Sequence, residues 1–337
     1  MKPRTEPTAT EAKDAAATMP AAVLEGDERV AVRAVARPTP GAGEVRVRLE
    51  GCGVCTSDLP VWEGRPWFDY PQEPGASGHE GWGRVEALGE GVDGLAVGDR
   101  VALLSYHAYA ACDLARADEV VKLPPKLDGR PFPGEPLGCA MNVFRRSGIE
   151  PGQTVAVVGV GFLGALLVGL ATAAGARVLA GSRRPFAREV AERFGAEATF
   201  STNDPDAAEA AVMDATDGDG CDVVIEATGK QGPLDLASRL VRVRGRLVVA
   251  GYHQDGTRTV DMRRWNWRGI DVINAHERDP DQYVRGMREA VAAVASGRLD
   301  PEPLYTHTVP LSKLSDAFRL IRERPHGFMK ALVGFGP

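Results

Sequence analysis

The pattern of apolar and polar positions differs between the two parts of the chain. Up to about Pro136, short apolar or alternating runs are separated by turns rich in glycine, proline and aspartate. Runs of this length and spacing predict β-strands. The clearest are Val45–Leu49, Gly83–Leu88 and Arg100–Leu104. We therefore expect the first part to be mainly β-structure.

From Thr154 onward, strand-like and helix-like runs alternate. The predicted strands are Thr154–Val158, Arg177–Ala180, Val223–Ala227 and Arg246–Ala250, and the predicted helices are Phe162–Ala174, Pro185–Phe194 and Leu234–Val241. Regular alternation of this kind is typical of a parallel, doubly wound sheet. The predicted fold class is therefore α/β.

The last part of the chain returns to short mixed elements. Trp265 and Trp267 precede Ile270–Ile273, and we interpret this stretch as an edge strand with aromatic packing. The predicted elements after it are a helix over Tyr283–Ala295, a strand over Thr306–Val309, a helix over Ser312–Arg322 and a strand over Met329–Phe335. No internal repeat is present.

Length and composition narrow the class of protein. A chain of 337 residues, 44% of them apolar, suggests about two domains with ordinary buried cores. A net charge of -6 without a basic stripe argues against nucleic acid as a partner. The apolar runs are too short to span a bilayer, which argues against a membrane partner. Five scattered cysteines favour the reducing cytoplasm, and residues 1–18 resemble a disordered extension.

A glycine-rich loop follows the first strand of the alternating part. Gly159, Gly161 and Gly164 form a G-x-G-x-x-G pattern between the strand and the helix that begins at Phe162. In this context the glycines allow a tight turn, a close approach of a pyrophosphate and close helix packing. The backbone at Phe162 and Leu163 then offers free N–H groups to the phosphates. The pattern predicts a dinucleotide-binding site.

The end of the second strand indicates which dinucleotide is bound. An NAD site places an acidic residue here, to bind the ribose 2′-hydroxyl. This chain has Ser182, Arg183 and Arg184 instead, which favour a 2′-phosphate through charge-assisted hydrogen bonds. NADP(H) is therefore preferred over NAD(H). Thr228 and Gly251, after the next two strands, are further expected cofactor contacts at the carboxyl end of the sheet.

Candidate metal ligands lie in the first part of the chain. Cys55, His79 and Glu80 combine a thiolate, an imidazole and a carboxylate within about two dozen residues. These are the ligand types that hold zinc while leaving a coordination position open for chemistry. Cys52 lies nearby, but the chain has no second cysteine pair to close a structural site around it.

These residues resemble a known family. Cys55–Asp58, the run Pro74–Val92 and the phrase VGDRV at Val97–Val101 are similar to the zinc-dependent medium-chain alcohol and polyol dehydrogenases. The similarity covers the chain from about Pro20. It implies a GroES-like, mostly-β catalytic domain over 19–136 and 282–337. It also implies a doubly wound, parallel-sheet Rossmann domain for NADP over 137–281.

The resemblance assigns roles to individual positions. Cys55 and His79 match the first two catalytic zinc ligands, and Asp58 matches the carboxylate that orients the histidine. Glu80 matches a neighbouring carboxylate that ligates directly or intermittently. Ser57 matches the residue that takes the alcohol proton, and Thr56 lies at a position near the pyrophosphate.

Two residues compete for the third ligand position. Alcohol dehydrogenases use a cysteine there, which would be Cys139. The run from Glu135 to Leu137, however, resembles the Glu-Pro-Leu of polyol dehydrogenases, whose glutamate faces the metal. A free cysteine is more often a small buried apolar residue than a ligand. We therefore favour Glu135 and keep Cys139 as the alternative.

The chain also departs from the family pattern. The four-cysteine lobe that holds a second, structural zinc is missing, because only Cys112 lies between Gly98 and Lys122. One catalytic Zn²⁺ is therefore expected. Pro60 replaces a histidine that often ends the proton relay, so that a ribose hydroxyl, His253 or water would have to complete it.

The predicted function is zinc-dependent hydride transfer between NADP(H) and a secondary alcohol, polyol or sugar-like substrate, or its ketone. Two alternatives stay open. One is an NADPH-dependent carbonyl or enoyl reductase, and the other is a non-catalytic nicotinamide-binding protein of the same fold. The expected partner is a small-molecule alcohol or carbonyl compound. The family's pairing of Rossmann edge strands suggests a homodimer or homotetramer.

Overall fold

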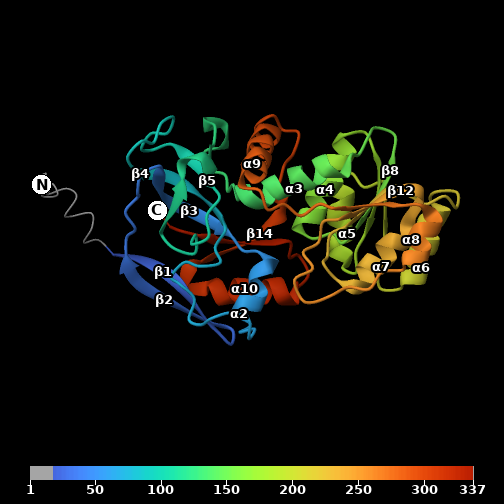
Figure 1. Ribbon diagram of the computed structural model, residues 1–337, viewed down its shortest axis with the longest axis horizontal. Coiled ribbons are helices and arrows are strands. Elements are labelled where there is room, and N and C mark those ends of the chain that lie inside the picture. Colours follow the sequence, from blue (N-terminus) through green and yellow to red (C-terminus); the bar gives the residue numbers. More distant parts are fainter. Residues whose placement is uncertain (1–17, 337) are drawn as a thin grey trace, which may run out of the picture. The chain divides into compact units, whose positions relative to one another are not determined.

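The computed structural model describes residues 18–336, so the extension predicted over 1–18 lies outside the described residues except for its last position. The chain divides into two compact units (Figure 1). The first unit runs to Glu135 and also contains Tyr305–Arg324 and the chain from Lys330. The second unit contains Pro136–Leu304 and Pro325–Met329.

The first unit is mostly β-structure. Its main sheet has the order β14-β15-β3-β4-β5-β7, with β6 paired to β3, and a separate hairpin is formed by β1 and β2. The strands are β1 (Thr18–Gly26), β2 (Arg29–Ala36), β3 (Glu44–Gly53), β4 (Glu80–Leu88), β5 (Arg100–Leu103), β6 (Cys112–Arg116), β7 (Val120–Lys122), β14 (Tyr305–Pro310) and β15 (Lys330–Gly334). The last strand of the chain thus lies beside β3, which comes from its beginning.

Two helices cover part of the core of this unit. They are α2 (Leu59–Trp62) and α10 (Leu314–Glu323). The rings of Trp62 and Phe318 stack with centroids 5.5 Å apart, and both side chains are fully buried. Trp62 is thus a core residue, because α10 supplies its apolar partner.

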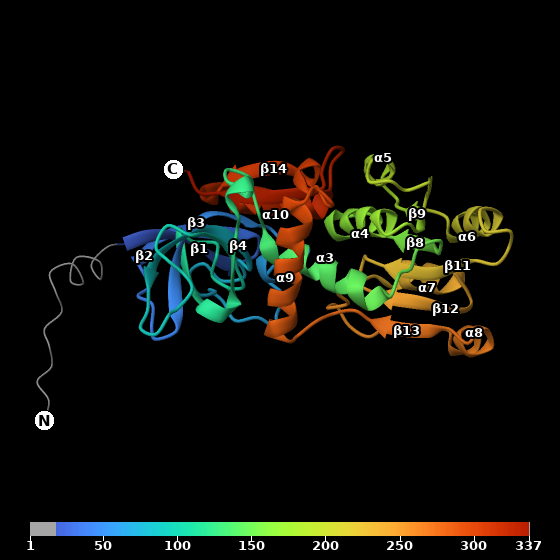
Figure 2. The same ribbon diagram turned by 90° about the horizontal axis from the view of Figure 1, so that it is seen from above.

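The second unit contains a six-stranded parallel sheet among the described residues, with the order β10-β9-β8-β11-β12-β13. Figure 2 shows β8, β11, β12 and β13 side by side in this order. The strands are β8 (Thr154–Val158), β9 (Arg177–Gly181), β10 (Ala198–Phe200), β11 (Cys221–Glu226), β12 (Val241–Val249) and β13 (Asp271–Asn274). The chain first builds outward from β8 through β9, then returns to β11 and builds outward on the other side. The sheet therefore has a topological switch point between β8 and β11.

Helices join consecutive strands of this sheet: α4 (Phe162–Ala173), α5 (Pro185–Arg193), α6 (Pro205–Asp214), α7 (Gln231–Leu240) and α8 (Met262–Arg268). Further helices flank it in the chain: α3 (Gly134–Ser147) precedes β8, and α9 (Pro280–Ala295) follows β13. α4 packs on β8 and β9, and α7 packs on β11 and β12. The strands have nearly continuous buried apolar runs because a doubly wound sheet is covered on both faces.

The sequence pattern identified most of these elements but misread one. Trp265 and Trp267 lie in α8, not in an edge strand. The side chain of Asp261 begins this helix by accepting a hydrogen bond from the backbone N–H of Arg264, an N-cap that favours a helix over a strand. The edge strand itself is present as β13, and it begins at Asp271.

The contacts end the second unit later in the chain than the family resemblance implied. The resemblance implied a boundary at 282, whereas the contacts keep α9 and the chain after it, up to Leu304, in the second unit. Gly138 of α3 and Gly286 of α9 explain this packing: a Cβ on Gly286 would lie 3.0 Å from the carbonyl carbon of Gly138. The two helices meet backbone to backbone there. No helix among the described residues is long and apolar enough to cross a membrane.

Candidate functional site

The three predicted ligands Cys55, His79 and Glu80 come together in the first unit. Cys55 lies two residues after β3, His79 directly precedes β4, and Glu80 is the first residue of β4. The antiparallel register pairs Glu80 with Gly53, which brings the ends of the two strands together. The ligand atoms of the three residues all lie within 4.8 Å of one another.

This donor set fits a zinc ion. Zinc bonds of about 2.0–2.3 Å in tetrahedral geometry place neighbouring ligand atoms roughly 3.3–3.7 Å apart. Atoms that already lie within 4.8 Å need only small side-chain adjustments to reach such positions. A thiolate with an imidazole suits zinc better than magnesium or calcium, which prefer oxygen ligands alone.

Glu80 is held by a partner that the sequence reasoning missed. Its carboxylate is fully buried, and Lys330 Nζ lies 2.6 Å from both of its oxygens. Lys330 is the first residue of β15 and is itself nearly buried. A Cβ on Gly53 would overlap Glu80 Oε2, so a glycine is needed opposite this carboxylate. A cation at the start of an otherwise apolar last strand was the only sequence signal for Lys330.

His79 is oriented by two acceptors. Its Nδ1 lies 2.8 Å from the carbonyl oxygen of Ser77 and 3.5 Å from Asp58 Oδ1. Asp58 is held in turn by the hydroxyl of Tyr109, which donates to Oδ2 at 2.8 Å. An Nδ1–H that donates to these oxygens leaves Nε2 for a metal. Asp58 was expected to orient His79. In the structure it shares this role with the backbone carbonyl of Ser77.

The buried groups around His79 shift one another's pKa values. Burial raises the pKa of Asp58 to about 6, although the nearby His79 acts to lower it. Burial acts to lower the pKa of His79, but the charges of Asp58, Cys55 and Glu135 raise it well above its usual value. This concentration of negative charge around one imidazole is favourable for a bound cation.

The two candidates for the third ligand lie on one helix. Glu135 is the second residue of α3, is half-buried and is close enough for its charge to raise the pKa values of His79 and Lys330. Cys139 follows four residues later, on the same face of α3. Among the described residues, the compact ligand cluster contains neither of them.

The glycine-rich loop of the second unit has the geometry of a phosphate-binding turn. Gly159 has φ = +106°, which a residue with a side chain rarely adopts. A Cβ on Gly164 would overlap the carbonyl oxygen of Gly159, whereas a Cβ on Gly161 would meet nothing within 4 Å. The space over Gly161 is therefore open in front of the N-terminus of α4, where Phe162 and Leu163 form the first turn. This arrangement fits an anionic diphosphate.

Comparisons with known proteins agree with these two features. A family model described as alcohol dehydrogenase GroES-like domain matches residues 41–145, and one described as zinc-binding dehydrogenase matches residues 163–293. The chain belongs to the medium-chain dehydrogenase/reductase family. Its first unit is the GroES-like part and its second unit is the Rossmann-type part, as the α/β prediction required. The protein is accordingly an oxidoreductase of the dehydrogenase type.

Individual relatives cover nearly the whole chain. A 2-dehydro-3-deoxy-L-galactonate 5-dehydrogenase from Pseudoalteromonas atlantica is 28% identical over 87% of this chain and 92% of its own. A sorbitol dehydrogenase from Halalkalibacterium halodurans is 26% identical over 88% of this chain and 94% of its own. A structure described as a zinc-binding dehydrogenase from Sinorhizobium meliloti, bound to NADP, has a TM-score of 0.80 at 27% identity, covering 95% of this chain and all of the other.

The three residues of the dehydrogenase that were predicted to bind a 2′-phosphate differ in burial and in their hydrogen bonds. Ser182 is buried, and its Oγ accepts a hydrogen bond from the backbone N–H of Arg184 at 3.3 Å. The guanidinium of Arg184 donates to the carbonyl oxygens of Phe328 at 2.6 Å and Val160 at 3.3 Å. Arg183, in contrast, is exposed. Arg184 thus stabilises the glycine-rich loop, and Arg183 is the arginine of the pair that faces solvent.

The remaining predicted residues of the dehydrogenase occupy two places. In the first unit, Ser57 donates to Asp58 Oδ1 at 3.4 Å, and Thr56 is exposed beside it. In the second unit, the backbone N–H and the hydroxyl of Thr228 donate to Glu226, and Gly251 packs against Gly229 of the loop after β11. The sequence reasoning missed Glu226, although a carboxylate at the end of an apolar strand was a visible signal.

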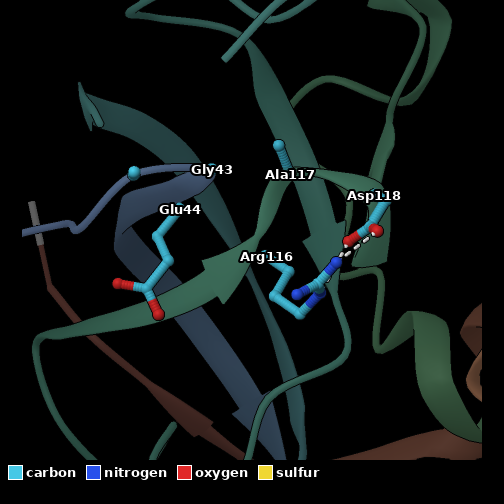
Figure 3. Close-up of a pocket in the computed structure, with 6 residues that line it drawn as sticks. Gly43, Glu44, Arg116, Ala117 and Asp118 are labelled. Atoms are coloured by element: carbon cyan, nitrogen blue, oxygen red, sulfur yellow. Dashed lines mark hydrogen bonds and ion pairs between the residues drawn. The ribbon is translucent and has the colours of Figure 1, made fainter. Parts of the chain in front are cut away.

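A surface hollow elsewhere in the dehydrogenase contains none of these residues. It is lined by Ala42–Glu44 and Arg116–Asp118 (Figure 3). Among its lining residues, Arg116 and Asp118 form an exposed ion pair, with 2.7 Å between nitrogen and oxygen. It has no buried polar group that would orient a ligand.

Proposed function

We propose that this protein is a zinc-dependent dehydrogenase that transfers a hydride between NADP(H) and a secondary alcohol, polyol or sugar-like substrate, or the matching ketone. The observation that carries the proposal is the convergence of Cys55, His79 and Glu80 within 4.8 Å, in a chain that also has an open glycine-rich loop. The relatives named for sorbitol and for a sugar-acid derivative support a polyhydroxylated substrate.

The proposed ligands are Cys55, His79 and Glu135 or Glu80. When bound, zinc would supply a Lewis acid for the substrate oxygen, and NADP(H) would supply the hydride acceptor or donor. Lys330 holds the Glu80 carboxylate with a charge-assisted hydrogen bond, and Asp58 with Ser77 orients His79. These contacts keep the ligand atoms in place before a metal binds.

Ser57 is the proposed proton carrier. In oxidation its oxygen would accept the alcohol proton as its own O–H proton is passed on, and reduction would run the same transfer in reverse. In the structure this hydroxyl donates to Asp58 Oδ1. Pro60 cannot continue such a relay, because proline has no titratable group. The proton would therefore leave through water or a cofactor hydroxyl.

The preference for NADP(H) rests on the end of β9. Asp or Glu would repel a 2′-phosphate there, and the chain has Ser182 and the exposed Arg183 instead. The S. meliloti structure with bound NADP supports the same preference. In this proposal Arg183 contacts the phosphate and Arg184 supports the loop.

A purified preparation tests the function directly. We expect about one zinc ion per chain by plasma mass spectrometry, NADP reduction with polyols or secondary alcohols, and NADPH oxidation with the ketones. Removal of the metal by a chelator should abolish turnover, and added zinc should restore it. Full turnover in a metal-free preparation would contradict the proposal. The same panel distinguishes the reductase alternative by including enones.

A further inference from the structure

Glu226 is a buried carboxylate for which hydride transfer at the metal gives no role. It is the last residue of β11 and has no solvent exposure. Its Oε1 accepts hydrogen bonds from the backbone N–H groups of Thr228 at 2.6 Å and Gly229 at 3.0 Å, and from the Thr228 hydroxyl. Its Oε2 lies 2.9 Å from His253 Nε2. Burying a carboxylate is costly unless donors surround it, as they do here.

The second partner of His253 determines which of its nitrogens carries the proton. Arg258 Nε donates to His253 Nδ1 at 2.9 Å. Because Arg258 can only donate, Nδ1 is the acceptor, and Nε2 must carry the hydrogen that bonds to Glu226. The three side chains therefore form a directed chain of hydrogen bonds from Arg258 through His253 to Glu226.

This chain joins two loops. One loop, residues 227–230, follows β11 and leads into α7, and the other follows β12 and contains residues 251–259. Arg258 also donates to the carbonyl oxygen of Gly229 at 3.0 Å, and Lys230 pairs with Asp255 at 2.6 Å.

The loops also touch through their backbones. A Cβ on Gly251 would overlap the backbone nitrogen of Gly229 and would lie 2.7 Å from Glu226 Oε2. At the far end of the contact, Gln231 and Thr259 exchange two hydrogen bonds of 2.9 and 3.0 Å. These contacts hold the two loops together, so that they form one continuous surface.

The sheet topology indicates which part of a dinucleotide would meet this surface. The dinucleotide in such a sheet lies across the switch point, here between β8 and β11, with its diphosphate at the glycine-rich loop. The residues that distinguish the adenosine ribose follow β9, on one side of β8. The other half, the nicotinamide riboside, falls on the side of β11 and β12, where the two fastened loops lie.

We propose that the Glu226–His253–Arg258 chain positions the nicotinamide half of the cofactor by holding the loops after β11 and β12 as one preformed surface. These are positioning residues, because their polar atoms are directed at one another and act through the loop backbone. A preformed surface loses less conformational entropy on binding than two separate loops do. The resulting gain in affinity applies only to the half of the ligand that touches this surface. This inference rests on the proposed binding of NADP(H).

Comparing two ligands tests the proposal. NADPH and 2′-phospho-ADP-ribose share the adenosine and diphosphate groups, but only NADPH carries nicotinamide. We expect His253→Leu and Glu226→Gln to weaken NADPH binding about tenfold by calorimetry, while the dissociation constant of 2′-phospho-ADP-ribose changes less than about twofold. His253→Gln is the matched control, because the glutamine amide can place a donor near the position of Nε2. It should retain most of the NADPH affinity.

Each other outcome has a defined meaning. Equal weakening of both ligands would show general damage to the fold, and unchanged binding of both would show that the loops need no fastening. Either result overturns the inference and leaves the proposed function intact. If the wild-type protein binds NADH and ADP-ribose instead, the same comparison applies to that pair. If the wild type binds neither pair, the proposed function fails first.

Discussion

Lys330 and Glu80 form a buried ion pair, with 2.6 Å between Nζ and Oε1, although they lie 250 residues apart in the chain. One comes from the last strand and the other from the first residue of β4. The ion pair fixes the position of the Glu80 carboxylate beside Cys55 and His79. It also ties the chain's last strand to the candidate metal site.

Removing the positive charge of Lys330 should strongly destabilise the metal-free protein. We expect Lys330→Met to lower the free energy of unfolding by about 3–5 kcal/mol, because it leaves a buried carboxylate without its partner. Urea unfolding in the presence of a chelator measures this loss. The double variant with Glu80→Gln should recover a large part of it, since the orphaned charge is gone. Equal losses in the single and double variants would contradict the coupling.

Metal content should separate ligands from neighbouring side chains. We expect Cys55→Ser to lower the zinc affinity by more than about tenfold, whereas Cys52→Ser retains it. Cys52 is buried, and its thiol donates to the carbonyl oxygen of Gly53 at 3.2 Å. Dialysis against buffered zinc, followed by metal analysis, gives both affinities.

The same measurement decides the third ligand. Glu135→Gln should weaken zinc binding by about tenfold or more, because an amide is a poorer ligand than a carboxylate. Cys139→Ser should change the zinc affinity by less than about twofold, if the Cys139 thiol only packs against its neighbours. The reverse result would assign Cys139 as the ligand, in the manner of the alcohol dehydrogenases.

Adjacent arginines should have different effects on cofactor use. Arg183→Gln should reduce the preference for NADP over NAD by about 10- to 100-fold, the effect of one charge-assisted hydrogen bond. Arg184→Gln should weaken both cofactors by a similar factor, because its guanidinium bonds to the backbone of the loop. The ratio of kcat/KM for the two cofactors is the measurement. A changed ratio only in the Arg184 variant would reverse the assignment.

Two buried thiols should resist alkylation in the folded protein. Burial raises the pKa of Cys221 to about 12 and holds that of Cys52 well above its usual value. The thiolate is the reactive form, and a raised pKa means that it forms only as the pH rises toward that value. At pH 8 the Cys221 thiol is therefore protonated and unreactive. Peptide mapping after iodoacetamide treatment should find both cysteines unmodified until the protein is unfolded.

The elements that the sequence predicted well are those with a strong local pattern. Thr154–Val158 has the same bounds in prediction and structure, and the helix from Phe162 ends one residue earlier than predicted. Both are buried apolar runs beside a glycine-rich turn, so local propensity and tertiary packing favour the same structure. In contrast, β10 has three residues and was not predicted, because it forms only by pairing with β9.

The candidate site likewise contains residues that the sequence could identify and a role that it could not. Cys55, His79 and Glu80 could be named from the sequence because their residue types and spacing carry the chemistry, and the antiparallel pairing of β3 with β4 brings them together. The role of Arg184 could not be read in this way. Its donors face carbonyl groups 24 and 144 residues away in the chain, so that a pattern of adjacent basic residues says nothing of them.

The sequence by itself thus determined the α/β class, the glycine-rich loop and the candidate metal-binding residue types of Cys55, His79 and Glu80, since periodicity and short-range spacing encode each of these. Only the tertiary structure decided which partners hold them: Lys330 for Glu80, and His253 for Glu226. The physical reason is that a buried charge requires a partner at hydrogen-bond distance. The register of strands far apart in the chain determines which residue fills that place.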